Sequence, residues 1–219
     1  MKIDTDPKHP IFKLCIETIR TMREGISKKE AFEIFIEWLC IKFSLEEYKV
    51  TPWITEEASK ILHEAFSVKT LGGIPAYKVD SWDWLGKLAQ EYGYIDPAKD
   101  GKDYLLLSKE DAATITAQKM IDLNVDPNGS VFTVSDVGTG QIIFDLINAG
   151  ADAVFAAEGE IEYYRIALLN ITMYDLPAGI LKADDKYDLN VDSPNWKQYA
   201  NLWTPPNKNS LSKKRKGEI

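Results

Sequence analysis

The sequence predicts an α/β protein, with a parallel sheet in the second half of the chain and an α-helical cap before it. Beyond residue 130, short apolar runs that are typical of strands alternate with helical patterns. The expected strands cover 130–136, 153–158 and 178–183, and the expected helices cover 140–150 and 160–175. Strands separated by helices of this length pair in parallel through right-handed crossovers. Residues 9–66, in contrast, show only helical periodicity.

The N-terminal region, residues 1–80, is expected to hold the helical cap. Apolar residues recur at three- and four-residue steps in two stretches, separated at Gly25: Ile11, Cys15, Ile19 and Met22, then Phe32, Phe35, Ile36, Leu39 and Phe43. A third helix is expected after Thr55, whose hydroxyl can accept a hydrogen bond from the first turn. The segment 71–75, with two glycines and a proline, breaks regular structure.

The segment between the cap and the sheet is expected to contain two more helices. The first is short, covers about 82–92 and is capped by Ser81, and a loop at 96–101 follows it. The second has Ser108 as its N-cap, because Asp111 stands three residues later, where a capping partner belongs.

The composition is that of a soluble globular protein, with 45% hydrophobic and 27% charged residues. No run approaches the roughly 18 apolar residues of a membrane span, and the polar N-terminus does not resemble a signal peptide. We therefore expect a cytoplasmic protein with no role at a membrane. Cys15 and Cys40 fall within helical apolar patterns, and with only two histidines beside them no metal site is predicted.

The net charge of −8 is unevenly distributed along the chain. Residues 207–219 form a basic tail, which holds Lys208, Lys213, Lys214, Arg215 and Lys216. The tail could bind phosphates through charge alone, or it could be a solvated terminus. The remainder is acidic, and acidic proteins bind polyanions poorly. Charge therefore neither supports nor excludes nucleic acid as a partner.

The most informative motif is a glycine turn after the first expected strand, Asp136-Val-Gly-Thr-Gly140. Gly138 and Gly140 permit a tight turn and a close approach of a ligand, and the following helix start offers unpaired N–H groups. A glycine pair alone more often marks an ordinary turn. Glu158, however, ends the next strand pattern, where an acid that binds ribose hydroxyls belongs, and Asp184 follows the third. Together these residues predict a nucleoside-type cofactor.

Two residues near the turn help to distinguish between cofactors. Dinucleotide-binding turns usually contain a third glycine, which lets the helix start pack close to the pyrophosphate, but Ile143 occupies that position. Asp136 would repel phosphate groups and would suit a cofactor that carries positive charge. Both observations argue against a dinucleotide.

These motifs resemble those of S-adenosylmethionine-dependent N-6 adenine DNA methyltransferases of the short phage and plasmid type. The matching segments are Trp84–Leu88, Tyr104–Ser108, Asp136–Gly140, Ala157–Asn170 and Leu181–Asp185. The resemblance covers residues 81–206. It implies a Rossmann-like methyltransferase sheet, S-adenosylmethionine as the cofactor and DNA as a partner.

The resemblance also implies roles for individual residues. Four residues of the turn would surround the methionine part of the cofactor: Asp136, Gly138, Thr139 and Gly140. Glu158 would accept hydrogen bonds from the ribose hydroxyls, and Asp184 would contact the adenine amine. Ser108 stands at the threonine position of an upstream motif that touches the methionine end, although Lys109 replaces the proline that follows there.

The catalytic motif departs from the family pattern, in which Asn, Asp or Ser precedes two prolines and an aromatic residue that stacks on a flipped base. The preferred candidate is Ser193-Pro194-Asn195-Trp196, where Asn195 replaces the second proline. The segment 203–207 has paired prolines but no aromatic residue after them. The alternative for both segments is a loop with packed tryptophans.

The chain after Trp196 bears on fold and activity together. About 23 residues follow it, too few for a seven-stranded methyltransferase sheet, so we expect a truncated sheet or one completed by a second copy or a partner subunit.

The expected function is methyl transfer to the N-6 amine of adenine in DNA. Alternatives are a noncatalytic binding or scaffold protein of the same fold, and an RNA or protein methyltransferase, because cofactor motifs do not specify the acceptor.

Overall fold

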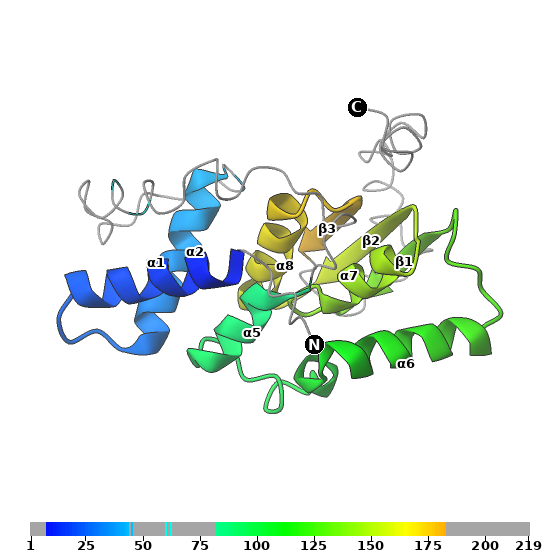
Figure 1. The fold of residues 1–219 in the computed structure, drawn as a ribbon, viewed down its shortest axis with the longest axis horizontal. Coiled ribbons are helices and arrows are strands. Elements are labelled where there is room, and N and C mark those ends of the chain that lie inside the picture. Colours follow the sequence, from blue (N-terminus) through cyan, green and yellow to red (C-terminus); the bar gives the residue numbers. More distant parts are fainter. Residues whose placement is uncertain (1–7, 44, 46–59, 61, 63–81, 183–219) are drawn as a thin grey trace.

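A computed structural model describes residues 8–43, 45, 60, 62 and 82–182 (Figure 1). These residues form a mixed α/β fold, built on an open three-stranded parallel sheet with the strand order β1-β2-β3. The strands are β1 (Val131–Ser135), β2 (Ala153–Glu158) and β3 (Ala178–Lys182). The predicted α/β class and the three predicted strands are confirmed.

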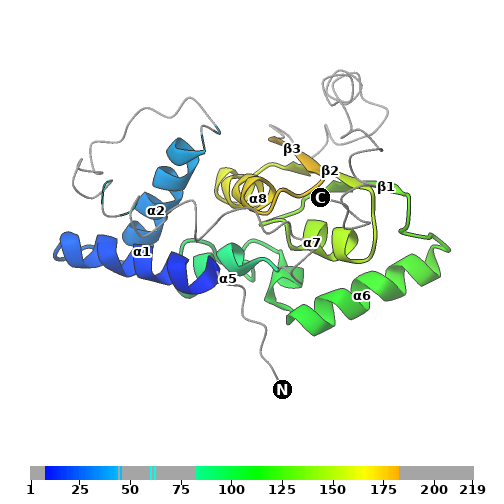
Figure 2. The ribbon, with the colours of Figure 1, turned by 45° about the horizontal axis from the view of Figure 1, so that its top comes forward.

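Two helices connect the strands and cover one face of the sheet (Figure 2). They are α7 (Gln141–Asn148), between β1 and β2, and α8 (Ile161–Met173), between β2 and β3. Successive right-handed crossovers in one direction bring both helices to the same side. The register pairs Ser135 with Ala157. The residues that follow β1 therefore lie beside the end of β2.

The main core lies between the sheet and these two helices. Phe132 and Val134 of β1 pack against it, while the alternate residues of the same strand are exposed. The central strand β2 is almost entirely buried, and α7 contributes Ile143 and Phe144 from its inner face. This burial pattern explains why β2 reads as a continuous apolar run, whereas β1 alternates.

The N-terminal helices α1 (Lys8–Met22) and α2 (Lys28–Lys42) pack against each other. Ser27 caps α2 in a capping box with Glu30. Helix α1 contacts α5 (Trp84–Glu91) and α2 contacts α8, so their buried side chains belong to the same apolar cluster as the sheet. The helix predicted after Thr55 lies outside the described residues except for Lys60 and Leu62.

The N-cap predicted for α5 (Trp84–Glu91) was wrong by two residues. The helix begins at Trp84, and its N-cap is Asp83, whose Oδ1 accepts a 2.7 Å hydrogen bond from the Gly86 N–H. A carboxylate at this position also interacts favourably with the helix dipole. The expected cap Ser81 lies outside the described residues.

Between α5 and the sheet, a short 3₁₀ turn (Asp103–Leu106) precedes α6 (Lys109–Asp122). The predicted cap of α6 is confirmed, since the Ser108 hydroxyl accepts a 3.1 Å hydrogen bond from the Asp111 N–H. Helix α6 contacts α7 and buries few residues, so it lies at the periphery (Figures 1 and 2). Of the helices that the structure describes, none has the length and apolar character needed to cross a membrane.

Candidate functional site

The candidate site lies at the carboxyl ends of β1 and β2, where the glycine turn leads into α7. Asp136 and Gly138 both adopt left-handed backbone conformations, with φ of 54° and 57°. Aspartate tolerates this region better than most residues, and glycine adopts it without steric penalty. The turn leaves the Asp136 carboxylate about half exposed at the edge of the sheet.

Glu158 ends β2 beside this turn and ties the two strand ends together. Its carboxylate accepts a 2.7 Å hydrogen bond from the Gly138 N–H and a 2.9 Å hydrogen bond from the Glu160 N–H. The side chain is almost fully buried. The residue predicted to bind ribose hydroxyls therefore stands at the expected strand end, against the glycine turn.

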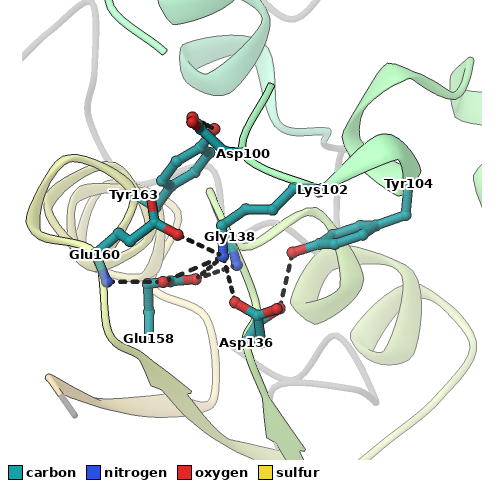
Figure 3. A network of polar contacts seen from close by, with 8 residues as sticks. All are labelled: Asp100, Lys102, Tyr104, Asp136, Gly138, Glu158, Glu160 and Tyr163. Carbon is teal, nitrogen blue, oxygen red and sulfur yellow. Dashed lines mark hydrogen bonds and ion pairs between the residues drawn. The ribbon is translucent and has the colours of Figure 1, made fainter. Parts of the chain in front are cut away.

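A residue that the sequence did not single out, Lys102, fills the space between these acids (Figure 3). Its ammonium donates a hydrogen bond to Asp136, and it lies 3.2 Å and 3.3 Å from the two Glu158 oxygens and 3.6 Å from Glu160 Oε1. The Lys102 side chain is only 1% exposed. One buried cation thus faces three carboxylates, two of them from adjacent strand ends.

The surroundings keep the Lys102 amine protonated. Burial alone would lower the pKa of Lys102, but the hydrogen bond to Asp136 and the charges of Glu158 and Asp136 outweigh it, and the pKa is raised. The ring of Tyr163 lies 4.9 Å from the ammonium and adds a cation–π contact. The hydroxyl of that tyrosine donates a 2.6 Å hydrogen bond to Asp100, two residues before the lysine.

The 3₁₀ turn after Lys102 covers the glycine turn. The Tyr104 hydroxyl donates a 2.8 Å hydrogen bond to the Asp136 carbonyl. A Cβ atom on Gly138 would lie 2.6 Å from that hydroxyl oxygen and 2.8 Å from Leu105 Cδ1, closer than such atoms can approach. The space beside Gly138 that a ligand would need is therefore filled by the side chains of Tyr104 and Leu105.

A second, buried network supports the turn from beneath. The fully buried Thr139 donates its hydroxyl hydrogen bond to Asp83. The Asn170 amide donates to the same carboxylate at 2.7 Å and to the Thr139 carbonyl at 2.9 Å. Burial raises the pKa of Asp83, opposed by these hydrogen bonds. The network joins the starts of α5 and α7 to α8 and fixes the position of the turn.

The structure brings together some of the predicted cofactor residues and assigns others to local contacts. Asp136, Gly138 and Glu158 meet at the cluster described above. Gly140, with φ of 93°, holds the left-handed backbone conformation from which α7 begins, where a side chain would be strained. The Ser108 hydroxyl contacts Asp111, to which it also donates at 2.8 Å.

The remaining predicted site residues lie outside the described part of the chain. They are the expected adenine contact Asp184 and the candidate catalytic residues Ser193, Pro194, Asn195 and Trp196. Their positions relative to the carboxylate cluster are therefore still sequence-based expectations.

Three polar residues of the site were missed by sequence reasoning. Lys102 is one of two lysines in a polar loop, and no local pattern distinguishes it from Lys99. Glu160 could have been noticed, because it follows a strand end by two residues, where a second acid faces the same edge. Asp83 could have been recognised as a helix cap, since aspartate is among the preferred N-cap residues.

Comparison of the chain with family models, with curated proteins and with solved structures found no match. The chemistry of the site therefore has to be judged from its own residues. Three carboxylates and a glycine turn can accept hydrogen bonds from ammonium and hydroxyl groups, and they favour positive charge over phosphate.

Proposed function

We propose that this chain binds S-adenosylmethionine at the carboxyl edge of its sheet and acts as a methyltransferase, with the N-6 amine of adenine in DNA as the favoured acceptor. The observation that carries the proposal is the convergence of Asp136 and Glu158 on a single cation, Lys102. In parallel α/β sheets, ligands bind outside the carboxyl ends of the strands, where these acids stand.

The residues present fit this cofactor in their chemistry. Its methionine part carries an ammonium and a sulfonium beside its own carboxylate, and its ribose carries two hydroxyls. The ammonium, the sulfonium and the hydroxyls suit the carboxylates of the site. Gly138 has no side chain, so a ligand can approach the backbone once Tyr104 and Leu105 give way. The strand order β1-β2-β3 with both helices on one face is compatible with one half of a Rossmann-like sheet.

When bound, S-adenosylmethionine would supply an electrophilic methyl group. The role of the chain is then to bind and orient, with Glu158 accepting hydrogen bonds from the ribose hydroxyls and Asp136 pairing with positive charge on the methionine part. The Asp83 network would hold the turn in place beneath the ligand. Such positioning is a large part of the catalysis of in-line transfer.

Calorimetric titration of the purified full chain with S-adenosylmethionine tests the binding step. Glu158→Gln should weaken binding at least tenfold, because hydrogen bonds to a charged acceptor contribute about 1.5–3 kcal/mol. Glu162→Gln on the exposed side of α8 is the matched control and should bind like the unsubstituted chain. Absence of binding to the unsubstituted chain at millimolar cofactor would contradict the proposal.

The acceptor requires a separate assay. The chain is incubated with S-adenosylmethionine that carries a radiolabelled methyl group and with DNA, RNA or protein, and the label transferred to each is measured. Label in DNA that is lost in Trp196→Ala supports transfer to adenine and a role for Ser193–Trp196. Label only in RNA or in protein would assign a different acceptor to the same cofactor site.

A second candidate function, a noncatalytic binding or scaffold protein, is favoured by one observation. Lys102 already neutralises the carboxylates that the cofactor would use, as expected of a fold that has lost its ligand. Cofactor binding without label in any acceptor, or no cofactor binding at all, would favour this candidate.

A further inference from the structure

Lys102 forms ion pairs with the carboxylates that the proposed function assigns to the cofactor (Figure 3). Its ammonium contacts Asp136, Glu158 and Glu160, and its side chain is as fully buried as that of Glu158. Burying an ammonium costs free energy unless carboxylates compensate for the lost water. A ligand that brings its own positive charge must therefore compete with Lys102 for the same oxygen atoms.

The neighbours of Lys102 obstruct the glycine turn in the same way. Tyr104 and Leu105 lie so close to the Gly138 Cα that even a single added carbon would collide with them. The Tyr104 hydroxyl also donates a hydrogen bond to the Asp136 carbonyl. A ligand that approaches the backbone at Gly138 cannot share this space, so the whole segment 102–105 must move before it binds.

The segment is attached in a way that permits such a movement. It belongs to the connection between α5 and α6, outside the sheet, and Lys87 and Gln90 of α5 hold it through the Leu105 carbonyl, the latter at 3.2 Å. Gly101, directly before Lys102, has φ of 71° and open space around its Cα. A movement about Gly101 would withdraw Leu105 from the core cluster and would leave the strand ends and the Asp83 network in place.

We propose that Lys102 is an internal substitute for the positive charge of the cofactor: it closes the site in the free protein, and cofactor binding expels it together with Tyr104 and Leu105. This inference rests on the proposed function and describes the regulation of the same site. Beside Asp136 one cation replaces another, while at Glu158 the ribose hydroxyls replace the Lys102 ammonium as hydrogen-bond donors. The apparent affinity is the intrinsic affinity multiplied by the fraction of molecules in which Lys102 has left the site.

The first test compares the affinity of Lys102→Met with that of the unsubstituted chain. Methionine has a similar length and no charge, so the three carboxylates lose their internal partner and the cofactor no longer competes with it. Calorimetry should show S-adenosylmethionine binding at least tenfold more tightly to this variant. Lys99→Met, an equal change at an exposed position of the same loop, is the control and should leave the affinity unchanged. Equal or weaker binding by folded Lys102→Met would overturn the inference.

The second test needs no variant and decides the matter if Lys102→Met does not fold. Acylation of lysine amines in the full chain, followed by peptide mass spectrometry, should leave Lys102 unmodified in the free protein and modify it at saturating S-adenosylmethionine. Lys99 should react equally in both conditions. If the cofactor binds while Lys102 stays protected, displacement is refuted and the proposed function survives. If the unsubstituted chain does not bind the cofactor, the inference and the proposed function both fail.

Discussion

Asp145, on the buried side of α7 just beyond the glycine turn, provides a quantitative test of the electrostatics beneath the site. The residue is 7% exposed, and burial raises its pKa from 3.8 to about 7. The nearby charge of Asp83 raises the pKa further, whereas Lys109 lowers it. At neutral pH the folded protein therefore holds a carboxylate that is more easily ionised in the unfolded chain.

The substitution Asp145→Asn removes this penalty. Because the folded-state pKa is raised, the stability contribution of Asp145 is fully present below about pH 4 and is lost as the pH rises to about 7. A shift of about three pH units at 1.36 kcal/mol each sets an upper bound of about 4 kcal/mol. We expect the variant to be about 2–4 kcal/mol more stable than the unsubstituted chain at pH 8, and within about 0.5 kcal/mol of it near pH 4.

Urea unfolding, followed by tryptophan fluorescence at several pH values between 4 and 8, measures this difference. Asp122→Asn, the same change at an exposed position of α6, is the matched control and should alter stability by less than about 0.5 kcal/mol. A pH-independent difference, or a less stable Asp145→Asn at pH 8, would refute the reasoning that burial penalises this charge.

Three further substitutions test the turn and its supports. Thr139→Val removes a hydrogen-bond donor from the buried Asp83 carboxylate and should reduce the free energy of unfolding by about 1–3 kcal/mol; an unchanged urea midpoint would exclude a supporting role for that hydrogen bond. Ser108→Ala removes the cap of α6 and should lower stability by about 1 kcal/mol, measured by thermal unfolding, whereas no loss would mean that water replaces the cap. Gly138→Ala forces a Cβ into a left-handed residue against Tyr104 and should lower stability by about 2 kcal/mol or more; a variant as stable as the unsubstituted chain in hydrogen exchange would contradict the close packing described here.

The parts of the fold that were predicted correctly are those that local patterns determine. Apolar runs separated by helices specify parallel strands, because the connection length leaves few alternatives. The N-cap at Ser108 was predictable, since its partner Asp111 is three residues away. At α5, by contrast, Ser81 was predicted and Asp83 is the cap. The Asp83 carboxylate also accepts hydrogen bonds from Thr139 and Asn170, which lie far along the chain and leave no signal near the helix start.

The same distinction applies to the candidate site. Asp136 and Glu158 were predicted because topology alone brings the ends of parallel strands together. Lys102 was not, because its position depends on the path of an irregular loop between two helices and on burial that no sequence period reveals. Burial of Thr139 was missed for a related reason, since its partner comes from another element.

The central claim is that Asp136 and Glu158 form a cofactor site which Lys102 occupies in the free protein. The most direct measurement is a crystal structure of the full chain grown with S-adenosylmethionine. In this structure we expect the ribose hydroxyls to lie on Glu158, the positive charge of the methionine part to lie beside Asp136, and the Lys102 ammonium to be withdrawn from both carboxylates. A cofactor bound elsewhere on the protein, with Lys102 still between Asp136 and Glu158, would contradict it.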